Sequence, residues 1–298
     1  MTPDGLGDIE LRPAREGDIT QFDRLWAEAE REDPSPDDDS LPLYAHELTT
    51  GAVWVAARGD RVVGMAAALI RGDVAVLAEL AVAADVQDRG IGRRLLAAVM
   101  PADVPERFTL SSRDRRAVGL YARVGMTPRW PVYELRAEQF DLQSLDGGVE
   151  AAVAAVDDPA FIAWDARVGK RHRPQDLTFV ANEVAAQPLW FRRGGATVGY
   201  GLVAQRMADE PKQSGTYALG PLGVGDPADA GACVAAALKW ARPRARAVRL
   251  DVPAPHPALA PLLEAGFRIV EDDQVFCCSS AATAADLASY LPTFVEIY

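Results

Sequence analysis

The residues whose types and spacing most directly suggest chemistry are Gln87, Gly90 and Gly92, in a turn between an expected strand and an expected helix. The first N–H groups of a helix have no partner within the helix, and the helix dipole makes that end positive. Glycine matters in such a turn because a side chain would block the approach of a ligand to the backbone. The turn could therefore hold a phosphate or a pyrophosphate.

Two well-known phosphate loops are excluded by the spelling of this turn. The pattern G-x-x-x-x-G-K-[ST] does not occur, and the third residue after Gly92 is Leu95, so G-x-G-x-x-G is incomplete. ATP and NAD are therefore poor candidates for the ligand. Taken alone, a G-x-G can also be a helix that merely begins after a glycine turn, and that alternative stays open at this point.

The elements that must position the turn follow from the spacing of apolar residues and of glycine and proline. The first half predicts the order β-α-α-β-β-β-α-β-α-β, which describes a mixed sheet with helices on its faces. Its middle three strands are separated by short glycine turns and are expected to form an antiparallel meander. The expected strands are residues 9–13, 52–58, 61–70, 74–82, 108–111 and 132–135, and the expected helices open near Asp18 and cover residues 44–48, 92–100 and 115–124.

A Gly-Gly pair at Gly147 and Gly148 separates this block from the rest, so we expect one domain over residues 1–146 and another over 147–298. The second block repeats the order loosely. Residues 120–126 (LYARVGM) and 262–267 (LLEAGF) both read as a helix that ends in glycine and enters a strand, which favours tandem duplication. The expected strands are residues 196–204, 216–222, 247–252 and 267–278, and the expected helices are 228–240 and 256–265.

Composition bounds the kind of protein. A chain of 298 residues with 49% hydrophobic and 25% charged residues is typical of about two globular domains. The net charge of −12 disfavours nucleic acid as the main partner and would attract a cationic or amine-bearing substrate. Apolar stretches such as residues 62–70 are too short to cross a membrane, and the acidic start lacks the basic region of a signal peptide, so a cytoplasmic protein is expected.

The spelling Q-x-x-G-x-G, between a fourth strand and an Arg-rich helix, resembles the acetyl-CoA pyrophosphate loop of the GNAT acyltransferase superfamily, [RQ]-x-x-G-x-[GA]. Residues 114–126 look like the N-x-x-A-x-x-L-Y-x-x-x-G-F helix of that family, at the usual distance after the loop. Two residues depart from this second pattern. Asp114 replaces the usual Asn, which bears on a side-chain contact to CoA, and Met126 replaces the usual Phe, a core exchange of similar size.

The resemblance implies an α/β fold of the mixed α+β kind, with two GNAT-like domains in tandem, each a mostly antiparallel twisted sheet flanked by helices. It also implies an N-acetyltransferase in which the first domain passes an acetyl or other short acyl group from acyl-CoA to a primary amine. The transfer would be a direct attack without a covalent enzyme intermediate. The residues implied to contact acetyl-CoA are Leu80, Ala81, Val82, Gln87, Asp88, Arg89, Gly90, Ile91, Gly92, Arg93, Asp114 and Tyr121.

Two side chains are the candidates for catalysis. The resemblance places Tyr121 near the CoA sulfur, where a phenol can protonate the departing thiolate; the alternative is that Tyr121 simply packs on the sheet. Glu79, in an apolar strand, is the first candidate for the base that deprotonates the amine, and the alternative is a solvent-facing or salt-bridged residue. A backbone N–H near Ala81 or Val82 would polarise the thioester carbonyl, as the resemblance implies.

The second block departs from the CoA pattern where its own loop belongs. Residues 219–231 contain no Q-x-x-G-x-G, and Asp226 and Asp229 would repel a pyrophosphate while capping the helix. We therefore expect a GNAT-like domain without the cofactor loop, whose apolar chain end, residues 291–298, docks somewhere. Arg171 and Arg173 are expected at the surface or at a contact between the domains.

The remaining polar residues indicate less. The three histidines share no metal-ligand spacing, so no metal site is expected. Cys233, Cys277 and Cys278 have the odd count and spacing of reduced core thiols. The acidic run at residues 37–39 is either a solvated loop or a means of recruiting a cationic acceptor.

The expected partners are acetyl-CoA and a small-molecule or peptide amine, with neither nucleic acid nor membrane, in a monomer or a homodimer. The identity of the acceptor, the acyl length and the general base stay open at this level. The alternative function, from another class, is a non-catalytic acyl-CoA-binding sensor or partner-binding protein that keeps the loop without turnover.

Overall fold

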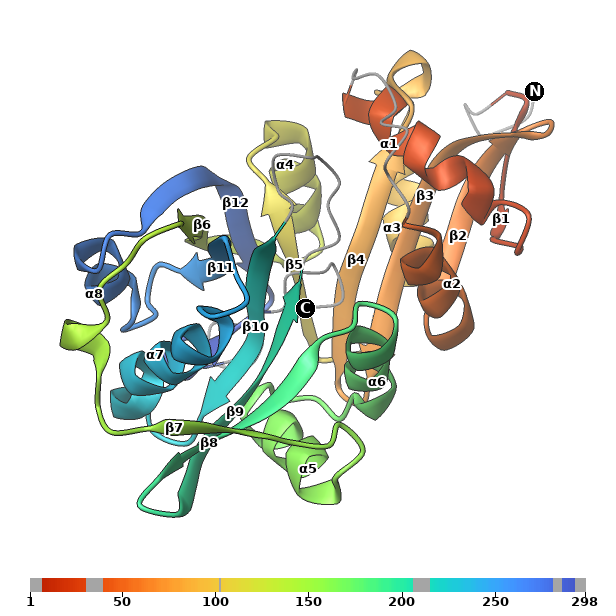
Figure 1. The fold of residues 1–298 in the computed structure, drawn as a ribbon. Helices are drawn as coiled ribbons and strands as arrows, with labels where there is room; N and C mark the ends of the chain where they lie inside the picture. The colour runs from red at the N-terminus through yellow and green to blue at the C-terminus, as the bar shows by residue number, and fades with distance from the viewer. Residues whose placement is uncertain (1–6, 31–39, 102, 206–214, 281–285, 293–298) are drawn as a thin grey trace. The chain divides into compact units, whose positions relative to one another are not determined.

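A computed structural model describes residues 7–30, 40–101, 103–205, 215–280 and 286–292 (Figure 1). By its contacts the chain divides into two compact units, Met1–Arg107 and Phe108–Tyr298. The domain boundary near Gly147, which rests on the Gly-Gly pair, stays a prediction. Among the described residues, no helix combines the length and the apolar character needed to span a membrane.

The first unit is built on an antiparallel sheet whose strands follow chain order. The sheet consists of β1 (Ile9–Pro13), β2 (Ala52–Arg58), β3 (Arg61–Arg71) and β4 (Val74–Val82), and the expected meander of β2, β3 and β4 is confirmed. Strand β3 is buried continuously from Val62 to Leu69, as expected of a strand covered on both faces. The helices of this unit are α1 (Phe22–Glu30), after a 3-10 turn at Ile19–Gln21, α2 (Leu41–Thr50) and α3 (Ile91–Val99).

Helix α3 forms where the sequence requires it, immediately after the glycine turn. Its buried residues Ile91, Leu95, Leu96 and Val99 have helical spacing and pack on β2, β3 and β4. Gly64 of β3 makes this approach possible, because a Cβ there would lie 3.1 Å from Leu95 Cδ1. Helix α1 packs on β3 and β4, and helix α2 packs on β2 and β3; both lie in front of the sheet in Figure 1.

The strands of the second unit lie in the order β5-β12-β6-β11-β10-β9-β8-β7, with β13 paired to β10. The strands are β5 (Glu106–Ser112), β6 (Thr127–Ala137), β7 (Glu150–Val153), β8 (Gln187–Arg193), β9 (Ala196–Gln205), β10 (Thr216–Val224), β11 (Ala247–Pro253), β12 (Arg268–Cys278) and β13 (Tyr290–Leu291). The helices are α4 (Arg115–Arg123), α5 (Pro159–Val168), α6 (Pro174–Asn182), α7 (Ala230–Ala241) and α8 (Leu259–Glu264).

Strands β6 and β12 are exchanged between the two halves of the sequence. Strand β12, from the end of the chain, pairs with both β5 and β6, and β6 in turn pairs with β11. The sixth strand of each half therefore pairs with the fifth strand of the other half: β6 with β11, and β12 with β5. The sequence predicted β6 only over residues 132–135, and the exchange explains its greater length, because β6 has a full strand on each side.

The core of the second unit lies between the sheet and α7. This helix is almost entirely buried, and its alanines and Cys233 allow it to lie close to β9 and β10. Gly199 of β9 serves this contact, because a Cβ there would lie 3.2 Å from Cys233 Sγ. All three cysteines are free and buried, so the expectation that they lie in the core is confirmed.

Candidate active site

The turn between β4 and α3 has the backbone geometry of an anion-binding loop. Asp88 and Gly90 both adopt positive φ, 65° and 79°. A left-handed conformation is unfavourable for Asp88, by about 1 kcal/mol or more, and such strain is common at functional sites. Turns that contain left-handed residues can present backbone N–H groups to an anion.

Helix α3 follows this turn directly. Gly90 is its N-cap residue, and the bond from Arg94 N–H to the Gly90 carbonyl, at 3.2 Å, is an early bond of the helix. The N–H groups of Ile91, Gly92 and Arg93 precede that bond and have no acceptor within the helix by its geometry. They lie at the positive end of the dipole, where a pyrophosphate is favoured.

Gln87 connects the loop to its surroundings. Its side-chain Nε2 donates to the carbonyl of Val82, at 2.9 Å, and to the carbonyl of Ala29 in α1, at 3.4 Å. A glutamine at this position therefore fastens the start of the turn to the end of β4 and to the last turn of α1. These two hydrogen bonds give a structural reason for the glutamine at the first position of the motif Q-x-x-G-x-G.

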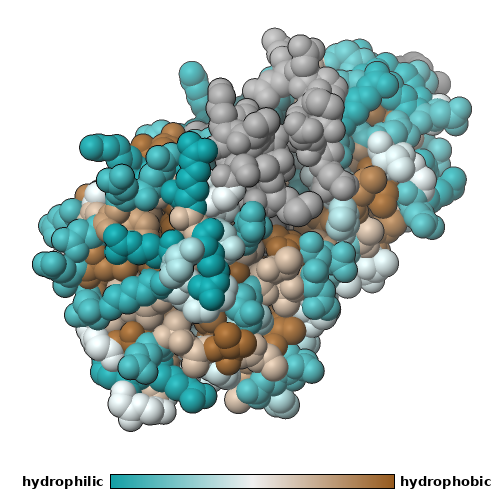
Figure 2. Space-filling model, viewed as in Figure 1, coloured by the Kyte–Doolittle hydropathy of each residue, from teal (hydrophilic) through white to brown (hydrophobic). Residues whose placement is uncertain are grey.

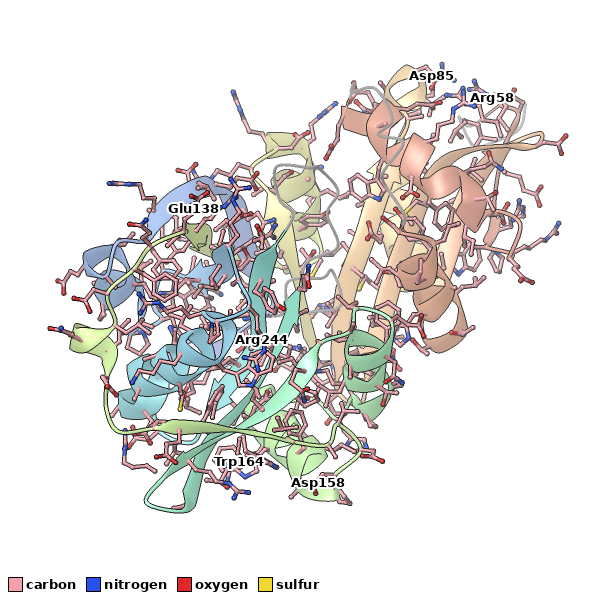
Figure 3. All side chains as sticks on the ribbon, in the orientation of Figure 1. Arg58, Asp85, Glu138, Asp158, Trp164 and Arg244 are labelled. Carbon is pink, nitrogen blue, oxygen red and sulfur yellow. The ribbon has the colours of Figure 1, made fainter. Side chains whose placement is uncertain are left out.

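Ion pairs hold the turn from the other side. Asp85, in the 3-10 turn Ala84–Val86, accepts from Arg61 at 3.1 Å and lies 3.6 Å from Arg58 (Figure 3). Arg61 also binds Glu28 of α1 at 2.6 Å. The hydrogen bond from Arg61 holds the pKa of the Asp85 carboxyl below its usual value. Arg89 and Arg93 are exposed beside the loop and available to a phosphate group.

The register of β3 and β4 shows which backbone N–H group at the end of β4 is not directed toward β3. Ala83 N–H donates to the Val63 carbonyl at 3.0 Å, and Val82 lies opposite Gly64. Because N–H groups alternate between the two edges of a strand, Val82 N–H points away from β3. Of the two residues suggested for polarising a carbonyl, Ala81 and Val82, this geometry favours Val82.

Glu79 is buried in β4, with 4% of its surface exposed, which excludes the solvent-facing alternative. It lies next to a bulge, since Ala67 pairs with Glu79 but Ala68 with Leu77. A bulge re-aims side chains and is common near active sites. Leu80, on the opposite face, is half-buried.

Tyr44 of α2 lies near Glu79. The Tyr44 hydroxyl donates to Asp23 Oδ1 of α1 at 2.8 Å. Burial, and next the carboxylate of Glu79, raise the pKa of the Tyr44 phenol well above its ordinary value. The two carboxylates, from α1 and β4, therefore make this part of the first unit acidic.

The second motif forms α4 in the second unit. The Asp114 side chain caps this helix by accepting from Arg116 N–H at 2.7 Å, and it pairs with the Arg116 guanidinium, which lowers the pKa of the carboxyl. Asp114 therefore performs the capping that Asn performs equally well. Met126 is fully buried, as expected for a core exchange.

Tyr121 is the buried residue of α4, with 6% of its surface exposed. The backbone carbonyl of Tyr121 accepts from the N–H groups of Val124 and Met126, and these bonds close the C-terminal end of α4. Helix α4 packs on β6.

The corresponding turn of the second half differs in length and charge. Five residues separate the end of β10 from the start of α7, against eight between β4 and α3. Asp226 accepts from Ala228 N–H at 2.9 Å and so caps the 3-10 turn Pro227–Asp229 that precedes α7. Asp229, the N-cap residue of α7, makes no capping hydrogen bond and pairs with Arg193 instead, so the expectation that it caps the helix was wrong. Both carboxylates lie in the turn before α7, where their negative charge disfavours a pyrophosphate.

Sequence reasoning missed a polar network in the second unit. Arg173 donates to both oxygens of Asp165, at 2.8 and 3.0 Å, and to the hydroxyl of Tyr290 at 2.7 Å. Tyr200 donates to Asp165 at 2.8 Å. All four side chains are buried, so the surface alternative for Arg173 is wrong. No local pattern signals this network, because its members come from α5, the start of α6, β9 and β13.

The rest of the described chain offers fewer candidates. His256 is buried at the entrance of α8, as expected, where its Nδ1 accepts from Ala258 N–H and burial lowers the pKa of the ring to about 4. The described ranges contain no group of histidine, cysteine and carboxylate side chains that could hold a metal ion. The face drawn in Figure 2 mixes hydrophilic and hydrophobic side chains. The acidic run at residues 37–39 lies outside the described residues.

Comparison with known proteins agrees with this geometry. Residues 49–127, from the end of α2 to the start of β6, match the sequence model of the acetyltransferase (GNAT) domain. The match includes the loop, Glu79 and Tyr121. The comparison with curated protein sequences gave no match.

Solved structures share the fold over nearly the whole chain. A proposed acetyltransferase from Pyrococcus horikoshii is 18% identical, with a TM-score of 0.71 over 97% of this chain and 95% of its own. A tandem GNAT protein from the clavulanic acid biosynthesis pathway is 19% identical, with a TM-score of 0.57 over 91% and 98%. A GCN5-related N-acetyltransferase from Sphaerobacter thermophilus is 15% identical, with a TM-score of 0.58 over 93% and 96%.

The fold is that of a GNAT protein with two such folds in tandem. At residues 49–127 the chain thus contains a segment that matches the acetyltransferase (GNAT) domain.

Proposed function

We propose that the first half of the chain transfers an acetyl or other short acyl group from acyl-CoA to a primary amine, and that the second half is not catalytic. The observation that carries this proposal is the β4–α3 turn. Its motif residue Gln87 is bonded to the strand end, Asp88 and Gly90 have positive φ, and the start of α3 presents N–H groups. This combination suits the pyrophosphate of CoA.

The reaction is a direct attack of the neutral amine on the thioester carbonyl. The carbon–nitrogen bond forms and the carbon–sulfur bond breaks through a tetrahedral species. The oxygen of that species carries negative charge, and Val82 N–H, on the outer edge of β4, would stabilise it. Holding both reactants in one site lowers the entropic part of the barrier.

Two protons move in this mechanism. Glu79 takes one from the ammonium, because only a neutral amine can attack; its buried position in an acidic part of the unit is compatible with a base. Tyr121 gives one to the CoA thiolate as it leaves. Helix α4 and the pattern L-Y-x-x-x-G support this role for Tyr121, which stays a proposal.

The negative charge of the chain and the carboxylates of Asp23 and Glu79 favour a cationic acceptor. The proposal is tested by CoA release from acetyl-CoA with a panel of amines, monitored by reaction of the free thiol. We expect release that depends on an amine and is lost in Gly92→Asp, whose carboxylate would meet the pyrophosphate. Release that does not depend on any amine, or that survives Gly92→Asp, would contradict the proposal.

A further inference from the structure

Strands β10 and β11 of the second half run parallel and then separate. They pair only from Thr216 with Ala247 to Leu219 with Leu250. Beyond that point the same edge of β10 pairs with β13, Leu222 with Leu291 and Gly223 with Tyr290. Strand β13 also contacts β11. A segment from the end of the chain thus fills the gap between the two strands and satisfies an edge that would otherwise be open.

The filled edge corresponds to the proposed catalytic edge of the first half. Val82 is the last residue of β4 and lies opposite Gly64, and Val224 is the last residue of β10 and lies opposite Gly199. In each half the N–H group of the next residue donates to a carbonyl of the third strand: Ala83 N–H to Val63 in the first half, and Gly225 N–H to Val198 in the second.

The two halves differ in the hydrogen-bond acceptor of the last N–H group of the fourth strand. Because Gly225 N–H is directed to β9, Val224 N–H points to the opposite edge, and it donates to the Ser289 carbonyl at 2.9 Å. The group that corresponds to the proposed thioester donor, Val82 N–H, is therefore bonded to the chain itself in the second half.

A buried side chain holds this segment in place. The Tyr290 hydroxyl accepts from Arg173 at 2.7 Å and from Arg171 at 3.5 Å, and Tyr290 is 2% exposed. Asp165 fixes Arg173 by two hydrogen bonds. Both donors are buried guanidinium groups, so the phenol oxygen receives charge-assisted hydrogen bonds.

We propose that residues 289–291 are a built-in occupant of the place that acyl-CoA would take in the second half, anchored by Tyr290, so that one chain binds one acyl-CoA. The proposal rests on the proposed function of the first half, from which the equivalence of Val82 and Val224 takes its meaning. The short turn with Asp226 and Asp229 closes the phosphate end of the same place independently.

Amide hydrogen exchange on the full chain tests the occupant directly, in the wild type and in Tyr290→Phe, which removes only the hydroxyl. We expect Val224 N–H to be protected in the wild type and to exchange about tenfold faster in the variant, because the segment loses charge-assisted hydrogen bonds. The amides of Ala218 and Leu250, where β10 and β11 pair directly, should keep their protection. Tyr217→Phe, on the same strand, is the matched control and should change none of these rates.

A second variant and a stoichiometry separate this proposal from the proposed function. If the Tyr290→Ala variant folds, its Val224 N–H should exchange faster still. If it does not fold, the exchange rate of Val224 N–H in Tyr290→Phe is the test. Titration with acetyl-CoA should give one equivalent per chain in the wild type and in Tyr290→Phe. Free exchange of Val224 N–H in the wild type, or two equivalents of acetyl-CoA, would overturn the occupant. Failure to bind acetyl-CoA at all, with Val224 N–H protected, would instead refute the proposed function and leave the occupied edge standing.

Discussion

Val82 and Val224 end the fourth strands of the two halves, and each lies opposite a glycine of the third strand, Gly64 or Gly199. Both glycines leave room for the helix that follows, α3 in one half and α7 in the other. The two strand ends thus share a register and a packing arrangement, and they differ in the turn that comes next. Against this shared register, the difference between the turns is the structural basis for proposing that only the first half binds acyl-CoA.

Tyr121→Phe removes the proposed acid without removing the ring. We expect kcat to fall at least tenfold, with little change in the Kd of acetyl-CoA, because general acid catalysis contributes about 10² or more to such rates. Steady-state kinetics and calorimetry give the two quantities. Tyr133→Phe, on β6, is the control and should leave both unchanged; an unchanged kcat in Tyr121→Phe would remove Tyr121 from the mechanism.

Glu79→Gln tests the proposed base. In the wild type the rate should rise with pH as the group that accepts the amine proton loses its own, and this limb of the profile should be lost or displaced in the variant. The profile of kcat/KM against pH measures it. Glu10→Gln, on an exposed residue of β1, is the control. A profile with the wild-type limb in Glu79→Gln would show that another group, or a chain of waters, accepts the proton.

Much of this architecture was predictable, because it depends on local pattern. The strands of the meander, helix α3 and the helix with Tyr121 all follow from apolar spacing and glycine turns, and the structure places each within a few residues of its predicted bounds. The loop was recognisable because glycine and the glutamine are needed at fixed positions for backbone reasons. Helices α5 and α6 and strands β7 and β8 were not predicted, since their sequences have weaker periodicity.

The exchange of β6 and β12 could not be predicted, because strand order is decided by pairing between residues more than 130 positions apart, such as Glu134 and Glu271. The same holds for the network of Asp165, Arg173 and Tyr290. A buried Arg is read from sequence as a surface residue until the carboxylate and the phenol that receive its hydrogen bonds are known.

The exchange of β6 and β12 places like charges opposite each other at Glu134, which destabilises the folded state. Glu134 lies between Asp251 of β11 and Glu271 of β12 in directly opposed positions, and Arg249 binds both Glu134, at 3.3 Å, and Asp251, at 3.7 Å. Burial, together with Asp251 and Glu271, raises the pKa of Glu134 from 4.5 to about 7. Opposed like charges destabilise a sheet.

The folded state therefore holds a proton on Glu134 that the unfolded chain releases between pH 4.5 and 7, so Glu134 makes stability fall as pH rises through that window. Glu134→Gln should weaken this dependence and raise the free energy of unfolding at pH 8 by about 1 kcal/mol, a value reduced for partial exposure to solvent. Urea unfolding at pH 5 and pH 8 measures both. Glu138→Gln, just after β6, is the control; a variant less stable than the wild type at pH 8 would contradict the argument.

Asp165→Asn should be among the most destabilising single changes in the second unit. It leaves the buried guanidinium of Arg173 without its charged partner, and breaking a buried pair costs about 3–5 kcal/mol. Thermal unfolding should show a large fall in Tm, whereas Asp158→Asn, which keeps a helix-capping oxygen at an exposed position, should show a small one. Equal, small effects would mean that the network contributes little to stability.

The central claim is that the β4–α3 turn binds acyl-CoA, and calorimetric titration of the full chain with acetyl-CoA tests it most directly. The titration should be run on the wild type, on Gly92→Asp and on Gly17→Asp, which adds the same charge at an exposed position with open space around it. The account predicts one binding event per chain in the wild type and in Gly17→Asp, and none in Gly92→Asp. Absence of binding in the wild type, or binding that survives in Gly92→Asp, would contradict it.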